Sequence, residues 1–209
     1  LKNKTVLCLG CGTGEECDYI CSKGASKVIG VDISSGMINY AKKSYPNIEF
    51  KVMDMENLDF YDETFDFVYS SLTLHYLKDW SKVLKEVLRV LRIDGIFLFS
   101  THHPVYWGAE KIKKDDKKSL KLGFTEFKNS HNLEVYGDYL NVREIKDIWF
   151  DEFEVYFYHK PFAYILKEIV NSGFKIIDCL EPKPEDSIQK KDNLFWDIYS
   201  KIPLFLIFE

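Results

Sequence analysis

Three glycines near the start of the chain have the spacing of a turn that holds a nucleotide-like ligand. Gly10, Gly12 and Gly14 follow an apolar run at residues 5–9 and precede a stretch with helical character. Glycine lets the backbone turn sharply and approach a ligand closely, and the following helix presents unpaired N–H groups at its N-terminus. The pattern therefore predicts a ligand-binding turn between a strand and a helix.

The residues after the third glycine argue against a dinucleotide as this ligand. Dinucleotide folds use the pattern G-x-G-x-x-G, which requires glycine at position 15, whereas Glu15 and Glu16 stand here. Two carboxylates at the start of a helix repel a pyrophosphate, but they are compatible with a ligand that carries a sulfonium and an ammonium group. A nicotinamide-dependent oxidoreductase is therefore disfavoured, and it stays open as an alternative.

Further candidate ligand contacts follow three later strands, at the point where each strand ends. The carboxylate of Asp32 can accept both hydroxyl protons of a ribose. Asp54 can accept from an adenine amino group, and Met55 can lie against the ring. The run 70–72 ends the fourth strand. Because ligands of doubly wound sheets bind at the carboxyl ends of strands, we expect these residues to face one crevice.

Two histidines that follow strands are candidates for proton transfer at this edge of the sheet. His75 follows the fourth strand and is the first candidate for a general base, and His103 follows the fifth strand and is the second. The ordinary pKa of histidine lies close to neutral pH, so either side chain could take a proton from a hydroxyl or a carbon acid. A purely structural role for each histidine is the simpler alternative.

Four cysteines have a spacing that could also be interpreted as a zinc or iron–sulfur set, namely Cys8, Cys11, Cys17 and Cys21. Cys8 lies inside a predicted strand and Cys11 inside the glycine turn, so the backbone geometry of both is already committed. Cys17 and Cys21 share one face of a predicted helix and are expected to pack as small apolar groups. We therefore expect no metal site.

The elements that position these residues alternate between short apolar runs and amphipathic stretches, as in βαβ units with a parallel sheet. Strands are predicted at residues 5–9, 27–32, 48–53, 65–71 and 96–101, and later at 174–180 and 204–208. One helix is predicted to begin with Asp79 as its N-cap and to end before Gly95, and another to span residues 162–172.

The alternation stops between residues 102 and 158, which we interpret as an insertion within a single domain of residues 1–209. The segment holds a lysine-rich stretch and then β-prone runs at 145–150 and 155–158. A structureless loop of this length is improbable in a compact domain. We expect the insertion to cover the carboxyl edge of the sheet, with Trp107 and Trp149 over a bound substrate.

The composition excludes several other classes of protein. A chain of 209 residues that is 46% hydrophobic and 29% charged is typical of one globular domain. Its net charge of −5 gives no general attraction to nucleic acid or to an anionic membrane. The five cysteines are an odd number without a secretory pattern, which favours reduced thiols and a cytoplasmic location.

Five motifs, taken in order, resemble those of class I S-adenosylmethionine-dependent methyltransferases: VLCLGCGTG, GVDIS, VMDMENLDF, FDFVYSSLTLHYL and VLRIDGIFLFS. The resemblance is to the small-molecule branch that includes ubiquinone and menaquinone biosynthesis enzymes, and it is close over residues 4–101. The later segment YHKPFAYILKEIVNSGFKIIDCLEP is also similar to this branch. The resemblance implies an α/β fold with a doubly wound Rossmann-like sheet of seven mostly parallel strands, ordered 3-2-1-4-5-7-6, whose last strand is antiparallel.

The resemblance also implies a cofactor, S-adenosylmethionine, which leaves as S-adenosylhomocysteine. The cofactor-binding residues that it implies are Gly10, Cys11, Gly12, Gly14, Asp32, Ile33, Met37, Asp54, Met55, Ser70, Ser71 and Leu72.

The methyl acceptor is expected to be a small molecule rather than nucleic acid. The D/N-P-P-aromatic motif for amino methylation of DNA bases is absent after the fourth strand, and no Pro-Cys pair offers a nucleophile for cytosine. We expect in-line methyl transfer by a monomer or homodimer, with no nucleic-acid or membrane partner. A noncatalytic S-adenosylmethionine-binding protein is the other alternative. Because the chain starts at Leu1, directly before the first strand, a further N-terminal segment is also expected.

Overall fold

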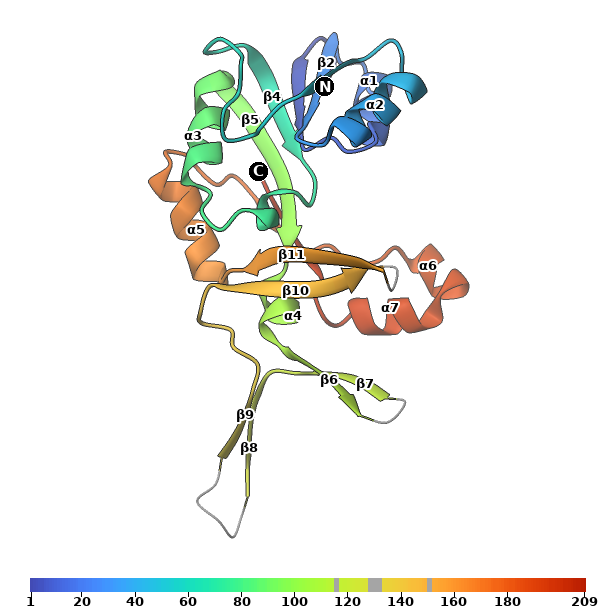
Figure 1. Ribbon diagram of the computed structural model, residues 1–209, viewed down its shortest axis with the longest axis vertical. Helices are drawn as coiled ribbons and strands as arrows, with labels where there is room; N and C mark the ends of the chain where they lie inside the picture. Colours follow the sequence, from blue (N-terminus) through green and yellow to red (C-terminus); the bar gives the residue numbers. More distant parts are fainter. Residues whose placement is uncertain (115–116, 128–132, 150–151) are drawn as a thin grey trace.

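The computed structural model describes residues 1–114, 117–127, 133–149 and 152–209. Its centre is a seven-stranded sheet in the order β3-β2-β1-β4-β5-β13-β12 (Figure 1). The strands are β1 (Thr5–Leu9), β2 (Lys27–Asp32), β3 (Glu49–Val52), β4 (Phe65–Ser70), β5 (Leu91–His102), β12 (Cys179–Leu180) and β13 (Phe205–Phe208). β13 runs antiparallel to both of its neighbours, β5 and β12, and the other neighbouring strands of this sheet are parallel. The predicted strand order 3-2-1-4-5-7-6 is confirmed: β12 is the sixth strand of the prediction and β13 is the seventh.

Helices cover both faces of the sheet, as expected for a doubly wound fold. They are α1 (Glu15–Ser22), α2 (Ser35–Ser44), α3 (Ser81–Val90) and α5 (Phe162–Asn171). The alternation along β1 explains the two layers, because successive side chains of a strand point to opposite faces. Leu7 and Leu9 pack in the cluster with α3 and α5, whereas Val6 and Cys8 pack in the cluster with α1 and α2. Figure 1 shows these two helix pairs on opposite sides of the sheet.

Two predicted elements differ from the observed ones. β5 begins at Leu91, directly after α3, and is therefore longer than the predicted strand 96–101. The predicted strand 174–180 is wrong over most of its length, since only β12 is a strand there. β12 pairs with β13 through Cys179 and Leu180 alone, while Ile177 donates its N–H to the carbonyl of Glu209. The partners of Cys179 and Leu180 in β13 are Phe208 and Ile207, so the described ladder is two residues long.

The insertion is built from a short helix and three antiparallel hairpins. The elements are α4 (Pro104–Gly108), β6 (Glu110–Lys114) with β7 (Lys117–Lys121), β8 (Gly123–Glu126) with β9 (Leu133–Tyr136), and β10 (Arg143–Trp149) with β11 (Phe153–His159). The two predicted β-prone runs lie in β10 and β11, although Phe150 and the side chain of Trp149 lie outside the described residues. Figure 1 shows β10 and β11 crossing below the end of β5, while the other two hairpins project away.

Two short helices precede the last strand and were not predicted, namely α6 (Asp186–Lys191) and α7 (Asn193–Tyr199). Asp192 caps α7 by accepting the N–H of Phe195 at 2.9 Å. None of the described helices combines the length and the apolar character that crossing a membrane requires.

Candidate functional site

The three glycines of the turn between β1 and α1 serve different purposes. All three have positive φ, which favours glycine. A Cβ atom at Gly10 would overlap the side chain of Thr73, and one at Gly14 would lie 2.8 Å from the ring of Phe50, so these two positions allow close packing. A Cβ atom at Gly12 would meet no atom within 4 Å among the described residues. Gly12 therefore faces open space, as a ligand-binding turn requires.

Asp32, at the end of β2, is held in place by the backbone of two loops. Its Oδ2 accepts the N–H of Gly12 at 3.0 Å, and its Oδ1 accepts the N–H of Ser34 at 2.8 Å. Each carboxylate oxygen has a second lone-pair direction. The carboxylate therefore has lone pairs free for two ribose hydroxyls while it fixes the glycine turn, and the ribose contact stays a prediction.

The end of β3 lies beside the end of β2. Val52 pairs with Asp32 in the ladder, and the N–H of Met53 donates to the carbonyl of Asp32 at 3.0 Å. This places Asp54 next in line, where Oδ1 accepts the N–H of Glu56 at 2.9 Å and the side chain is exposed. Met55 is half-buried against the core beside it. The predicted adenine contacts thus lie along the same edge as Asp32.

Two apolar side chains on this edge are exposed. Ile33 is 70% exposed and Met37, in the first turn of α2, is 46% exposed. An apolar ring laid across them would remove this surface from water. Exposed apolar groups, a carboxylate with free lone pairs and open space at Gly12 fit the adenosine portion of S-adenosylmethionine.

The end of β4 corrects one predicted contact. Ser70 is fully buried and its hydroxyl donates to the carbonyl of Leu9 at 3.0 Å, so this side chain holds β4 to β1 and is not free for a cofactor. Ser71 and Leu72 are half-buried beyond it. Leu72 has φ 47°, and its N–H donates to the carbonyl of Ser100 at 3.1 Å. The strained turn lies at the carboxyl edge, where the methionine portion was expected.

His75 lies in a buried aromatic stack. Its ring is 3.6 Å from that of His102 between centroids, and His102 stacks in turn on Trp107 at 4.7 Å. Phe157 of β11 packs edge-on against both histidines. Neither ring nitrogen of His75 has a hydrogen-bond partner among the described residues. Burial, followed by the nearby His102, lowers the pKa of His75 to about 2, so the ring is neutral and a weak base near pH 7.

Both ring nitrogens of His103 form hydrogen bonds within the protein. Its Nδ1 accepts the N–H of Val105 at 3.1 Å and caps α4, and its Nε2 lies 2.8 Å from Oε1 of Glu181. Because Nδ1 is an acceptor, Nε2 carries the hydrogen that is donated to Glu181. Both nitrogens are therefore occupied, and this geometry does not support the predicted role of His103 in proton transfer.

A buried ion pair near this stack was not predicted from the sequence. Lys160 is 3% exposed; its Nζ donates to Oε2 of Glu168 at 2.6 Å and to the carbonyl of Lys78 at 2.7 Å. Oε1 of Glu168 accepts the N–H of Trp80 at 3.0 Å. Burial is the main effect on Lys160 and lowers its pKa, against the opposing effect of Glu168. The pair joins α5 and the end of β11 to the segment that follows His75. The sequence offered one signal, a lysine two residues after the predicted run 155–158.

The cysteines are free thiols. The pKa of Cys11 is raised by a hydrogen bond with Cys17 and by burial, which keeps the thiol protonated and unreactive. The described residues contain no group of three or more His, Cys, Asp or Glu side chains placed to hold a metal ion.

Comparison with known proteins identifies the family of the chain. The methyltransferase domain model Methyltransf_11 matches residues 7–99, which include the glycine turn, Asp32, Asp54 and β4. The crystal structure of an S-adenosylmethionine-dependent methyltransferase from Mesorhizobium loti superposes with a TM-score of 0.81 at 27% identity, over 99% of this chain and 90% of that one.

Two curated relatives extend the match. An uncharacterized protein of Haemophilus influenzae is 30% identical over 99% of this chain and 81% of its own length. A putative methyltransferase, 235L, of Invertebrate iridescent virus 6 is 48% identical over 69% of this chain, and the match spans 57% of the viral protein. With the strand order and the carboxylates at the strand ends, these matches assign the chain to the class I S-adenosylmethionine-dependent methyltransferases.

Proposed function

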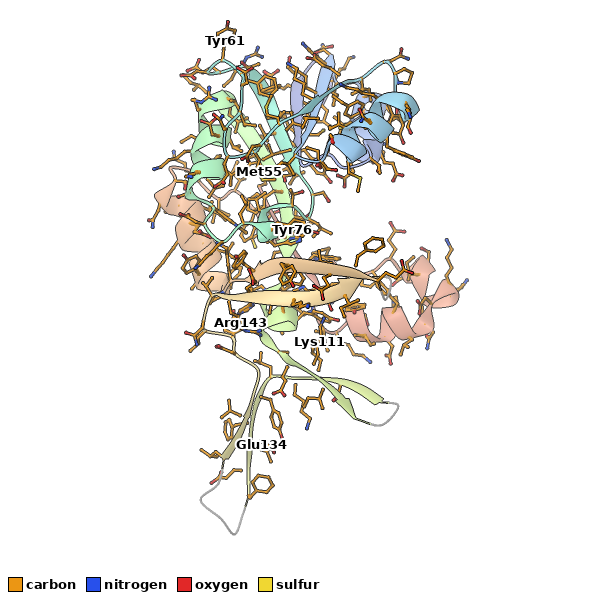
Figure 2. The ribbon with its side chains drawn as sticks, viewed as in Figure 1. Met55, Tyr61, Tyr76, Lys111, Glu134 and Arg143 are labelled. Atoms are coloured by element: carbon orange, nitrogen blue, oxygen red, sulfur yellow. The ribbon has the colours of Figure 1, made fainter. Side chains whose placement is uncertain are left out.

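We propose that this methyltransferase acts in the cytoplasm on a small-molecule acceptor and transfers the methyl group by in-line displacement. The observation that carries the proposal is the position of the β10–β11 hairpin at the carboxyl edge. Phe157 of β11 packs against His75 and His102, which follow β4 and lie at the end of β5. Figure 2 shows Met55 and Tyr76 on the sheet side of this hairpin. Because the hairpin covers part of the carboxyl edge of the sheet, this edge favours a small acceptor over a nucleic-acid duplex or a membrane.

The chain's own residues would bind the cofactor, orient the acceptor against it and exclude water from the site. Asp32, Asp54, Ile33 and Met37 would hold the adenosine, and Ser71 and Leu72 would adjoin the methionine portion. The bound cofactor supplies a methyl group on a sulfonium, which is already activated for displacement. Orientation of the acceptor against that group can contribute about 7 to 11 kcal/mol, so no covalent nucleophile is needed.

The net charge of −5 supports a small acceptor, since the long-range field repels polyanions. The nicotinamide alternative is disfavoured because Glu15, Glu16 and Asp18 all lie in the first turn of α1. We propose a monomer or homodimer that needs no nucleic acid, membrane or metal ion.

The direct test uses radiolabelled S-adenosylmethionine with three groups of acceptors: small hydroxyl, amine and thiol compounds, total RNA, and duplex DNA. The proposal expects label in at least one small compound and none in the polymers. Label in RNA or DNA alone would contradict it. Binding of S-adenosylhomocysteine without transfer to any acceptor would favour the noncatalytic binding protein instead.

A further inference from the structure

A cavity of about 430 Å³ lies within the insertion, between the end of α4, the end of β9 and the start of β10. This volume is in the usual range for a site that binds a small molecule. Figure 2 shows Arg143 and Lys111, which line the cavity, on the opposite side of the β10–β11 hairpin from Met55 and Tyr76. The cavity is therefore separate from the expected cofactor site at the edge of the sheet.

One wall of the cavity is fixed by contacts between backbone segments. The N–H of Asp138 donates to the carbonyl of Gly108 at 2.8 Å. Gly137 has φ 76°, and a Cβ atom there would lie 2.6 Å from the same carbonyl oxygen, so only glycine allows this approach. Because the wall is already formed, binding of a ligand would require little further ordering of the chain.

Arg143 differs from the other two arginines of the chain in its partners. Its Nε donates to the carbonyl of Asp138 at 3.4 Å, and its Nη2 donates to the carbonyl of Trp107 at 3.0 Å. Arg89 and Arg92 form ion pairs with carboxylates, whereas no described residue forms an ion pair with Arg143 or accepts from its Nη1. Arg143 therefore presents a half-buried positive charge, held in place by backbone, with donors free for a carboxylate.

Two carboxylates of the lining also form no ion pair with any described residue, namely those of Asp138 and Glu110. Asp138 is half-buried, and its Oδ1 accepts the N–H and the side-chain amide of Asn141 at 3.3 and 2.9 Å. None of the described residues donates to its Oδ2. The remaining cations of the lining, Lys111 and Lys146, already pair with carboxylates of the β10–β11 hairpin. The charges that remain for a ligand are thus of both signs.

Arg143 and Asp138 are neighbours whose charged groups do not pair. The guanidinium contacts the backbone carbonyl of Asp138, and in the described structure it forms no ion pair with the carboxylate of the same residue. A ligand with a carboxylate and an ammonium group on one carbon atom could contact both, with its carboxylate on Arg143 and its ammonium group on Oδ2 of Asp138. An apolar side chain of this ligand would cover Ile145 and Val135, of which Val135 is 69% exposed.

We propose that this cavity binds a small zwitterion, namely an α-amino acid with an apolar side chain. Arg143 binds the carboxylate, Asp138 binds the ammonium group, and Val135 and Ile145 contact the side chain. The cavity shares no residue with the predicted cofactor contacts. This binding site is therefore independent of methyl transfer and of the identity of the acceptor.

The ligand class is tested by calorimetry with L-phenylalanine and L-leucine. Each is compared with the acid that lacks the ammonium group, hydrocinnamate or isocaproate, and with the amine that lacks the carboxylate, phenethylamine or isoamylamine. At least one amino acid should bind at a single site per chain, about ten-fold or more tightly than its acid and its amine, because each analogue loses a hydrogen bond between charged groups. Lack of binding by both amino acids, or equal binding of an amino acid and its acid, would overturn the proposal.

The position of the ligand is tested with Asp138→Asn, which keeps the shape of the side chain and the acceptor for Asn141. This variant should bind the amino acid about ten-fold or more weakly, while the matching acid should bind no more weakly than to the parent. Glu134→Gln is the matched control, because it removes an exposed carboxylate of β9 that does not line the cavity. A parent-like affinity in Asp138→Asn, or an equal loss in Glu134→Gln, would contradict the assignment.

Arg143→Gln should weaken binding of the amino acid and of its acid, whereas Arg92→Gln, at an arginine outside the cavity, should bind both like the parent. Because Arg143 also ties α4 to β10, Asp138→Asn decides the result if Arg143→Gln does not fold. A folded Arg143→Gln protein with unchanged affinity for the amino acid would overturn the proposal.

Competition distinguishes this cavity from the cofactor site, since S-adenosylhomocysteine itself carries an amino-acid group. The amino acid is titrated into the parent protein with and without saturating S-adenosylhomocysteine. The two affinities should agree within about three-fold, because the two sites share no residue. Loss of amino-acid binding in the presence of S-adenosylhomocysteine would place the amino acid in the cofactor site and overturn the proposal.

Discussion

At the residue scale, Asp32 links the glycine turn to the proposed ribose site, because its two oxygens accept N–H groups from both flanking loops. Asp32→Ala should therefore weaken binding of S-adenosylhomocysteine ten-fold or more. Hydrogen bonds to a charged group contribute about 1.5 to 3 kcal/mol each, and about 1.4 kcal/mol corresponds to one decade. Calorimetry measures the change, with the exposed Asp59→Ala as control. An unchanged dissociation constant in Asp32→Ala would mean that the ribose site lies elsewhere.

Gly12 is the glycine whose side-chain position faces open space, with φ 51°. Gly12→Val should abolish binding of S-adenosylhomocysteine, because the branched side chain would occupy ligand space and strain the turn. Circular dichroism should remain native, since no neighbouring atom in the described structure is displaced. Gly36→Ala is the matched control, because its nearest neighbour, Oγ of Ser34, lies at 3.7 Å and its φ is ordinary. A Gly12→Val protein that binds like the parent would show that the turn does not touch the cofactor.

At the element scale, the β10–β11 hairpin is attached to the sheet by stacked rings. Trp107 lies 4.7 Å from His102 and 4.6 Å from Phe157 between centroids, which favours an anchoring role over a direct role in covering the acceptor. Trp107→Ala should first lower the melting temperature, with a loss of about 3 to 5 kcal/mol for a large aromatic side chain. Affinity for S-adenosylhomocysteine should change less than three-fold. Native stability together with lost methyl transfer would restore the covering role.

The Lys160–Glu168 pair should also stabilise this region. The side chains are 1% and 11% exposed, and removing one partner of a buried pair leaves a charge without compensation. Lys160→Met should lower the free energy of unfolding in urea by about 3 to 5 kcal/mol, and the double variant with Glu168→Leu should recover part of the loss. Lys201→Met, which breaks an exposed pair with Asp197, should cost less than about 1 kcal/mol. Equal effects of the two lysine variants would contradict this account.

The elements differ in how far the sequence could predict them. β1 and β2 begin and end at the predicted residues because both are bounded by glycine, aspartate or charged residues and both are buried. β6 to β9 were not predicted, since their short sequences lack the sustained alternation of apolar and polar residues that marks a half-buried strand. The strand predicted at 174–180 is too long, because an apolar run does not indicate how many residues of a partner strand will pair with it.

The site shows the same division. Asp32 ends β2, and Asp54 and the glycines lie shortly after β3 and β1, so their position could be predicted from the chain alone. Other contacts join segments that are distant in the sequence, so no local pattern predicts them. They are the contact of Glu16 with Tyr69 and the contacts of Lys160 with Glu168 and Lys78. The neutral state of His75 depends on burial by β11, which the sequence could not show.

At the scale of the whole molecule, the central claim is that one edge of the sheet selects S-adenosylmethionine and rejects a dinucleotide. Calorimetric titration of the intact chain with S-adenosylmethionine, S-adenosylhomocysteine and NAD tests this most directly. We expect both sulfur compounds to bind with one site per chain and NAD to give no measurable heat. Asp32→Ala should abolish or weaken both signals in parallel. Binding of NAD with no binding of either sulfur compound would contradict the account.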